Sequence, residues 1–223
     1  MNRRSAFDLI DHEHHAWEEV LGLLEGSTNA PVVLKASREA GERTLYHLQV
    51  STKSYLGAVA LEAGGILWDN GWVVLLGAGH PDVYGSLAGW NGLEESPFLS
   101  LEGMLVAAYD AAGGFFALDT GKFGGHGLIH YWAPDSLAWE STELRYSGFL
   151  NWLAEGDLEQ FYGTFRWHDW RKDMAQLAAG QVFAYYPPLW TREGGGETSS
   201  KAPISVLEAW RAVIESTGRE GGA

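Results

Sequence analysis

The sequence contains no cysteine, which excludes disulfide bonds, thiol catalysis and zinc sites with cysteine ligands. Basic residues are scarce, since 15 lysines and arginines stand against 29 aspartates and glutamates and leave a formal net charge of −14. Such a charge repels phosphate backbones, so we expect no nucleic-acid partner, and a basic protein is the partner class that it favours. Solubility alone is the alternative explanation of the charge.

Long apolar runs are absent as well. No stretch approaches the ~20 residues of a membrane helix. The N-terminal residues MNRRSAFDLIDHEHH include two arginines but lack the apolar segment of a secretory signal. We therefore expect a soluble, cytoplasmic protein with no membrane partner.

Apolar and aromatic residues are abundant. Hydrophobic residues occupy 46% of the 223 positions, and tryptophan alone occurs 11 times. This length and composition support a sizeable core, in one large domain or two small ones, rather than a disordered chain.

The middle of the chain predicts two strands joined by a glycine-rich loop. Residues 115–118 and 128–132 are short, apolar and aromatic runs, which is typical of buried strands. Three glycines between 124 and 127 tolerate the positive φ angles that a hairpin loop requires.

A second hairpin is predicted around Asn70 and Gly71. Apolar runs at 66–68 and 72–76 flank this dipeptide, and Asn-Gly between such runs is the strongest short-range hairpin signal. Both residues tolerate positive φ, so we expect a type I′ turn.

Helical segments surround these strands. Ser5 is the predicted N-cap of a short helix over 6–10, and Ser147 caps an amphipathic helix in the second half of the chain. Residues 54–63 are small and apolar and predict a buried helix, with a strand as the alternative because alternation is absent. Asp157 is expected to cap a further helix.

Together these elements predict one α+β domain with a largely antiparallel sheet packed with helices. Links as short as these suit antiparallel strands, because a parallel pair needs a longer crossover. The sheet is expected to include residues 66–68, 72–76, 115–119, 128–132 and 182–186.

The C-terminal part is expected to be less tightly built. The core domain covers 1–191, and the glycine- and serine-rich composition of 192–202 predicts a flexible linker. Residues 203–216 form an amphipathic helix that docks on the core or on a partner. Residues 217–223 are a glycine-rich tail.

Asp119 has two competing interpretations. The Asp-Thr-Gly at 119–121 follows an apolar strand as in an aspartic protease, but such an enzyme needs two aspartates that share a proton, and Lys122 departs from that pattern. The favoured interpretation is a structural carboxylate that accepts hydrogen bonds from turn amides. Asp119→Asn should then cost little stability, and Asp119→Ala roughly 1–2 kcal/mol. The alternative function is a small hydrolase that uses Asp119 with His126, His130 or His168.

No metal or cofactor site is predicted. His12, His14 and His15 are potential metal ligands that lie close together in the sequence, but only two of them share a helical face. A solvated turn is the favoured interpretation. The Gly-Ala-Gly at 77–79 lacks the third glycine of a dinucleotide loop.

Tryptophans near loops predict a binding surface. Aromatic residues of this kind are frequent hot spots, although core packing is the favoured role of any single one. Trp190 lies in a similar setting. The expected surface consists of Trp90, Asn91, Asp119, His126, Trp167, His168 and Trp170.

Several segments resemble a bacterial family of uncharacterised proteins, the domain of unknown function 2625. The resemblance covers most of the chain and carries no catalytic residues. It rests on LGAVALEAGGILWDNGWVVLLGAGH (56–80), the Gly-Trp-Asn at 89–91, FFALDTGKFGGHGLIHYWAPDSLAWE (115–140), FLNWLAEGDLEQFY (149–162) and QVFAYYPPLWT (181–191).

The layout is also similar, more distantly, to the SUKH superfamily of bacterial immunity proteins. The shared features are a central glycine-rich turn, a strand that ends in a polar turn, and the Phe-Leu-x-x-Leu helix at 149–153. This resemblance implies a SUKH-like α+β module that binds a basic, toxin-like protein and catalyses nothing. The sequence also allows a homo-oligomer.

Overall fold

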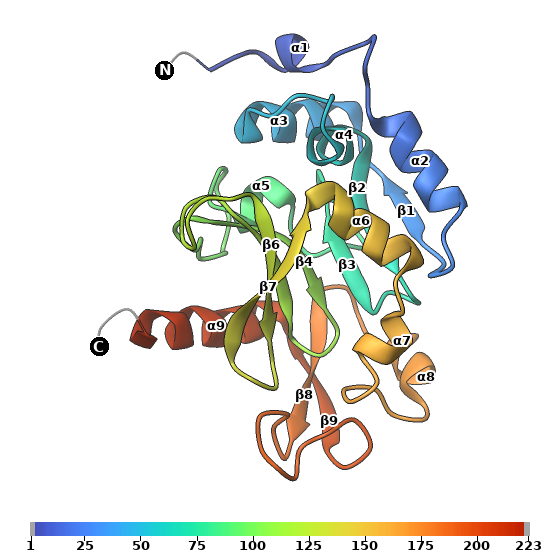
Figure 1. Ribbon diagram of the computed structural model, residues 1–223, viewed down its shortest axis with the longest axis vertical. Coiled ribbons are helices and arrows are strands. Elements are labelled where there is room, and N and C mark those ends of the chain that lie inside the picture. The colour runs from blue at the N-terminus through green and yellow to red at the C-terminus, as the bar shows by residue number, and fades with distance from the viewer. Residues whose placement is uncertain (1–2, 221–223) are drawn as a thin grey trace.

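A seven-stranded antiparallel sheet forms the centre of the fold in the computed structural model, which describes residues 3–220 (Figure 1). The strands lie in the sheet in the order in which they occur along the chain. The predicted α+β class with a largely antiparallel sheet is confirmed. The strands are β1 (Val32–Lys35), β2 (Ala63–Trp68), β3 (Val73–Leu76), β4 (Met104–Asp110), β5 (Phe115–Asp119), β6 (Leu128–Ala133) and β7 (Ala138–Arg145).

Helices precede β1, lie between β1 and β2 and between β3 and β4, and follow β7. Ser5, Ser54 and Asp157 each accept a hydrogen bond from a backbone amide in the first turn of the helix that they precede. No helix within residues 3–220 has the length and apolar character needed to span a membrane. The helices are α1 (Ala6–Leu9), α2 (Trp17–Glu25), α3 (Arg38–Leu48), α4 (Tyr55–Glu62), α5 (Leu87–Trp90), α6 (Tyr146–Glu155), α7 (Leu158–Phe161), α8 (Trp170–Met174) and α9 (Val206–Glu220).

The two faces of the sheet are covered by different helices. Side chains alternate along a strand, so Phe115 and Phe116 of β5 point to opposite faces. Phe116 packs against Phe149 and Trp152 of α6, with ring centroids 4.8 and 6.0 Å apart. Phe115 packs against Trp210 of α9 at 4.9 Å. Helix α6 therefore covers one face and α9 the other.

The turn between β2 and β3 has the predicted form. Asn70 and Gly71 have φ angles of 58° and 81°, and Trp72 N donates to Asp69 O at 3.1 Å. Positive φ at both central residues is the property of a type I′ turn, so the Asn-Gly hairpin is confirmed.

Gly71→Val is expected to lower the free energy of unfolding by about 1–3 kcal/mol, because a β-branched residue is strained at positive φ. Strain rather than a clash is the cause, since the atom nearest to an added Cβ would be Met174 Cε at 3.9 Å. Gly22→Ala in α2 is the control, because no atom lies within 4 Å of its added Cβ and alanine favours the helix. Urea denaturation measures both, and an unchanged midpoint for Gly71→Val would contradict the prediction.

The strand at 182–186 does not belong to the main sheet, which corrects the sequence-based prediction. It forms β8 (Gln181–Tyr186), which pairs with β9 (Ser200–Ser205) in a separate two-stranded sheet. This hairpin is attached to the turn after β4 by Phe183 N, which donates to Ala111 O at 2.8 Å.

The segment predicted as a linker and helix also has different boundaries. Its residues 200–205 form β9, and the last helix begins at Val206 instead of 203 and extends beyond 216. A side chain on Gly194 or Gly196 would clash with the backbone of Pro188 or Arg166. These glycines permit close packing, whereas their composition alone suggests flexibility. Residues 221–223 of the predicted tail lie outside the described residues.

Strand β7 is missing from the sequence-based prediction. It is the terminal strand of the sheet and its sequence, AWESTELR, is largely polar, so no buried face marks it. Helix α6 follows it directly and begins at Tyr146, with Arg145 at the N-cap position. The prediction of Ser147 as the N-cap is therefore wrong.

Helix α9 docks on the domain itself. Trp210 is fully buried, and its ring centroid lies 5.8 Å from that of Trp90. Its Nε1 also donates to Leu99 O at 2.6 Å. Of the two docking places that the sequence leaves open for the last helix, the core is the one observed.

Candidate functional site

The tryptophans expected at a binding surface are buried. The exposed fractions are 0% for Trp90, 8% for Trp167 and 2% for Trp170. Trp90 belongs to α5, whereas Trp170 begins α8, on the other side of the molecule in Figure 1. The structure therefore does not gather the seven expected residues into one surface.

Trp90 and Asn91 join α5 to the sheet. The Trp90 ring stacks on Phe98, with centroids 4.0 Å apart. The Asn91 side chain donates to Leu87 O and Val106 O and accepts from Val106 N at 2.7 Å. Both side chains therefore form these contacts within the fold.

Asp119 organises the glycine-rich loop that follows β5. Its Oδ1 accepts from the amides of Gly121 and Phe123, both at 3.0 Å, and its Oδ2 from those of Gly125 and His126 at 2.8 and 3.3 Å. Burial raises the pKa of Asp119, but the four amides outweigh it and hold the pKa below the ordinary value. The expected hydrogen bonding by turn amides is confirmed.

The histidines of the alternative hydrolase do not converge on this carboxylate. His126 contributes its backbone amide and has an exposed side chain. His130 is 7% exposed and stacks on Phe123 at 4.6 Å. His168 is exposed and directly precedes Asp169 at the start of α8. The hydrogen bonds of Asp119 leave neither of its oxygens without a backbone partner.

The N-terminal histidines lie apart from these residues. His15 Nε2 lies 3.5 Å from Glu62 Oε1, and His12 and His14 are exposed. Across residues 3–220, no three histidine, aspartate or glutamate side chains gather in a way that could hold a metal ion.

Trp170 packs against a buried arginine, and Trp167 lies in the same aromatic cluster. The Arg166 guanidinium lies 4.1 Å from the Trp170 ring centroid and 4.7 Å from that of Trp72. Its Nη2 contacts Asp69 Oδ2 at 2.5 Å. Trp167 packs against Trp72 at 6.0 Å, so this aromatic cluster binds a cation that the chain itself supplies.

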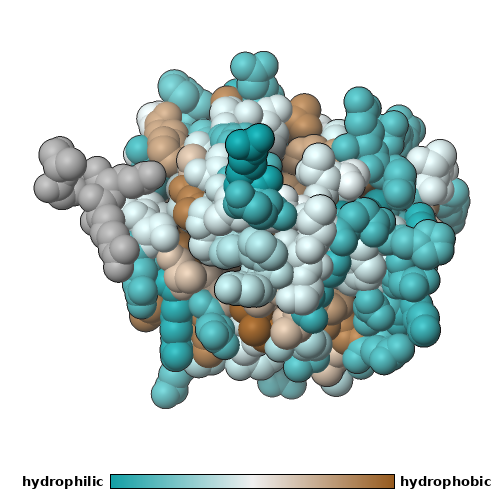
Figure 2. Space-filling view, turned by 90° about the horizontal axis from the view of Figure 1, so that it is seen from below, coloured by the Kyte–Doolittle hydropathy of each residue, from teal (hydrophilic) through white to brown (hydrophobic). Residues whose placement is uncertain are grey.

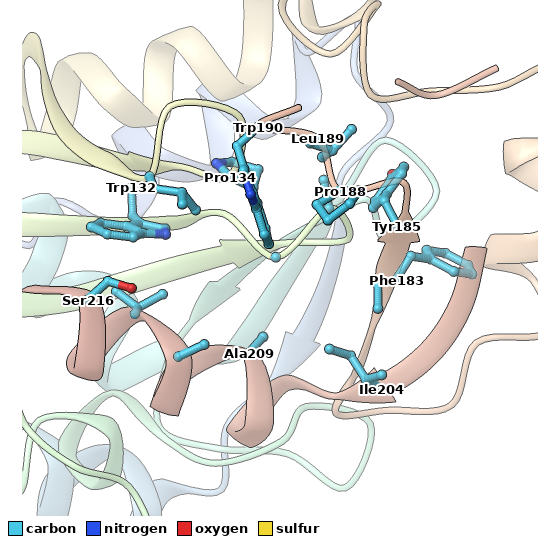
Figure 3. A pocket seen from close by; sticks show the side chains of 16 residues that line it. Trp132, Pro134, Phe183, Tyr185, Pro188, Leu189, Trp190, Ile204, Ala209 and Ser216 are labelled. Carbon is cyan, nitrogen blue, oxygen red and sulfur yellow. The ribbon is translucent and has the colours of Figure 1, made fainter. Parts of the chain in front are cut away.

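An open apolar groove lies between α9, the β8–β9 hairpin and two turns of the main sheet. Its volume is about 330 Å³. Figure 3 shows Trp190 and Pro134 on one side and the α9 residues Ala209 and Ser216 on the other. The lining residues are Ala112, Gly113, Trp132, Pro134, Leu137, Phe183, Ala184, Tyr185, Pro188, Leu189, Trp190, Ile204, Ala209, Ala212, Val213 and Ser216.

The groove follows from the sizes of the residues that meet there. Helix α9 presents the small side chains of Ala209, Ala212 and Ser216, while Trp210 and Val213 anchor it in the core. These small helix side chains leave the space between α9 and the neighbouring turns and strands open. Seen from the end of the molecule that carries β8 and β9, apolar and hydrophilic residues are interspersed (Figure 2).

Trp190 is the most exposed aromatic residue of the groove, with 55% of its surface accessible. It extends from a tight loop in which Thr191 N donates to Pro188 O at 3.0 Å. The sequence places it among tryptophans near loops, but only the tertiary structure separates it from the buried ones. None of the seven residues of the expected surface lines the groove, so sequence reasoning leaves out Trp190 together with the rest of the lining.

We call the rim of the groove the charged residues that directly adjoin a lining residue in the sequence, and these residues are mainly acidic. Asp135, Glu208 and Glu215 are exposed and directly adjoin a lining residue in the sequence. Arg211, which precedes Ala212, is the basic residue in an equivalent position. An apolar groove with such a rim suits an apolar group that carries positive charge nearby.

Comparisons with known proteins place the whole domain among bacterial relatives. A family model described as "Protein of unknown function DUF2625" matches residues 7–209. The "Putative uncharacterized protein YbfG" of Escherichia coli (strain K12) is 38% identical over 208 residues, which cover 93% of this chain and 94% of the relative. An "Uncharacterized protein" of Haemophilus influenzae (strain ATCC 51907 / DSM 11121 / KW20 / Rd) is 36% identical over 186 residues, or 81% and 80% of the two chains.

Proposed function

Because the chain belongs to the DUF2625 family, as its motifs predict, and the family description states no activity, we propose from the site itself that it is a non-catalytic protein-binding module. The binding site is the apolar groove beside α9. The partner is a basic protein that inserts an apolar side chain into the groove and places positive charge on the acidic rim.

The observation that carries this proposal is the half-exposed Trp190 at an open, almost wholly apolar groove. Tryptophan is enriched among the residues that dominate binding energy. Removal of a large ring from a desolvated pocket costs much of the binding free energy. A groove of about 330 Å³ accommodates anchoring side chains rather than a whole folded element.

The net charge of the chain favours a basic protein over an anionic lipid as the partner. The net charge of −14 opposes approach to anionic lipid headgroups, as it opposes nucleic acid. A basic protein gains from the same charge, both in the rate of encounter and in the contacts at the rim. A toxin-like partner, which an immunity-protein role implies, is one protein of this chemistry.

The test uses two groove variants and one matched control. Ala212→Glu places a charge in the groove at an exposed helix position, and Trp190→Ala removes the ring. Tyr186→Ala is the control, because Tyr186 is 77% exposed on β8 and does not line the groove. The partner is captured from a lysate of the native host, identified by mass spectrometry, purified and titrated by calorimetry.

We expect Trp190→Ala to weaken the affinity by about 30-fold, which corresponds to a hot spot of about 2 kcal/mol. Ala212→Glu should weaken it by at least as much, and Tyr186→Ala should leave it unchanged. Equal affinity for all four proteins would contradict the proposal. So would co-purification of a lipid or small molecule, in place of a protein, that Ala212→Glu expels.

A further inference from the structure

We infer that the chain has a second binding site, independent of the groove, that takes a methylated ammonium group. The site is a cavity of about 280 Å³ on the face of the sheet opposite α9. Its aromatic walls are Tyr131, Trp152 and Phe161, and Glu140 stands at its edge.

The strand register builds the floor of this cavity. Phe116 of β5 lies opposite Tyr131 of β6, and Tyr131 lies opposite Glu140 of β7. Directly opposed residues share a face, so these three side chains form one row across the strands. The β7 residues that line the cavity are Glu140, Ser141, Thr142 and Leu144, in the stretch where the register of β6 against β7 shifts.

Two helices form the walls but do not close the cavity. Trp152 comes from α6 and Phe161 from α7. Phe116 is fully buried beneath them, whereas Phe161 is 40% exposed, so the cavity opens to solvent at α7 and β7. Glu140 on the terminal strand is also exposed.

The aromatic walls of the cavity pack against one another at steep angles. Phe161 lies 4.9 Å from Trp152 at an interplanar angle of 77°, and 5.4 Å from Tyr131 at 60°. The Tyr131 hydroxyl donates to the buried carboxylate of Asp110 at 2.8 Å, so its ring is held in place before any ligand arrives. Pre-organised walls reduce the entropy that binding costs.

The chemistry of the lining selects a cation. Aromatic faces attract alkylated ammonium groups through their quadrupole, and methyl groups gain from contact with apolar rings. Glu140 accepts a hydrogen bond from Ser136 Oγ at 2.6 Å, a neutral donor that leaves the carboxylate charge uncompensated. A negative charge at the mouth of an aromatic cavity rejects anions and attracts the same ammonium group.

The size of the cavity restricts the ligand to a small group. A volume of about 280 Å³ is at the lower end of ligand pockets, so a single headgroup or one side chain fits. The methylated ammonium belongs either to a free molecule such as choline or to a trimethyllysine side chain. The two sources share the same contacts in the cavity and differ in what lies outside it.

The experiment titrates the whole protein with choline and with a short trimethyllysine peptide, followed by tryptophan fluorescence. We expect saturable binding with a dissociation constant on the order of 1 mM for choline. A peptide affinity about 10-fold higher would assign the source to a protein side chain, and equal or weaker peptide binding to a free molecule. Each of these results supports the site.

Matched variants locate the binding. Phe161→Leu and Glu140→Gln should each weaken it at least 5-fold, because one removes a ring and the other the charge. Glu143→Gln is the control, since Glu143 is an exposed acid on the same strand that does not line the cavity. Thermal melting confirms that all variants fold.

No saturable signal at concentrations about 100-fold above 1 mM would overturn the inference, and so would binding that is unchanged in Phe161→Leu. The variants of the other groove, Trp190→Ala and Ala212→Glu, should bind choline as the wild type does. Failure of one proposal is thereby distinguished from failure of the other.

Discussion

Arg166→Met is expected to destabilise the protein by about 3–5 kcal/mol, because it removes one partner of a buried ion pair. Arg166 is 4% exposed and its guanidinium contacts Asp69 Oδ2. Asp69 lies in the turn before β3, so the ion pair joins the segment after α7 to the central sheet. Removal of the guanidinium leaves the Asp69 carboxylate, whose side chain is only 14% exposed, without this counter-charge, and an uncompensated charge in a largely desolvated position is the main cost.

The guanidinium also contributes through the rings around it. It lies within 5.1 Å of the ring centroids of Trp72, Tyr162 and Trp170. Lysine keeps the charge but lacks the planar group that packs between rings and contacts Asp69 at the same time. Arg166→Lys should therefore recover only part of the lost stability.

Urea denaturation of Arg166→Met, of Asp69→Asn and of the double variant separates the effect of the charge from the effect of packing. The double variant Asp69→Asn with Arg166→Met should be more stable than Arg166→Met alone, because the stranded charge is removed. If the double variant loses the sum of the two single losses, the ion pair is not the origin of the effect. A loss below about 1 kcal/mol for Arg166→Met would reject the prediction outright.

Asp119→Ala is expected to cost about 2–3 kcal/mol, more than the sequence alone suggests. Four backbone amides donate to this carboxylate, and hydrogen bonds to a charged acceptor are stronger than neutral ones. The substitution leaves all four donors of the loop without their acceptor.

The geometry also corrects the expectation for Asp119→Asn. Each carboxylate oxygen accepts from two amides, so an asparagine must point its own NH₂ group at two N–H donors whichever way it turns. Asp119→Asn should therefore cost about as much as Asp119→Ala, on the order of 2 kcal/mol. From the sequence the two side chains look like similar acceptors, because the number of donors becomes visible only in the folded loop.

The dependence on pH provides the control. The pKa of Asp119 is lowered in the folded state, so its contribution is present above the unfolded pKa and is lost as the pH falls through the folded pKa. The stability gap between wild type and Asp119→Asn should thus be largest near neutral pH and shrink under acid. A gap that is constant from neutral pH to strong acid would show that the carboxylate charge has no role.

Local signals in the sequence predict those elements whose chemistry is local. The Asn-Gly turn, the cap at Ser5 and the cap at Asp157 all depend on residues within a few positions of one another. Strands β7 and β9 escape prediction because both are edge strands with many exposed side chains, and β9 contains Pro203. Proline is tolerated at an edge, but in a sequence it argues against a strand.

The candidate site depends on tertiary contacts that local signals do not encode. A tryptophan beside a loop has the same local signal whether it is buried, as Trp90 is, or half exposed, as Trp190 is. The groove exists because α9 returns to the sheet beside β8, and no sequence spacing encodes that contact. The aromatic cavity likewise depends on β7, which the sequence pattern does not reveal.

The order of the strands determines how the chain can assemble while it is being synthesised. Each strand of the sheet pairs with one made just before it, so the sheet can form progressively from its N-terminal end. Trp210 of α9, which packs on Trp90 and Phe115, is synthesised much later. At ribosomal rates the interval between Ala133 and Trp210 is roughly 4–15 s, during which the sheet face around Phe115 lacks its cover by α9 and is accessible to chaperones or to aggregation.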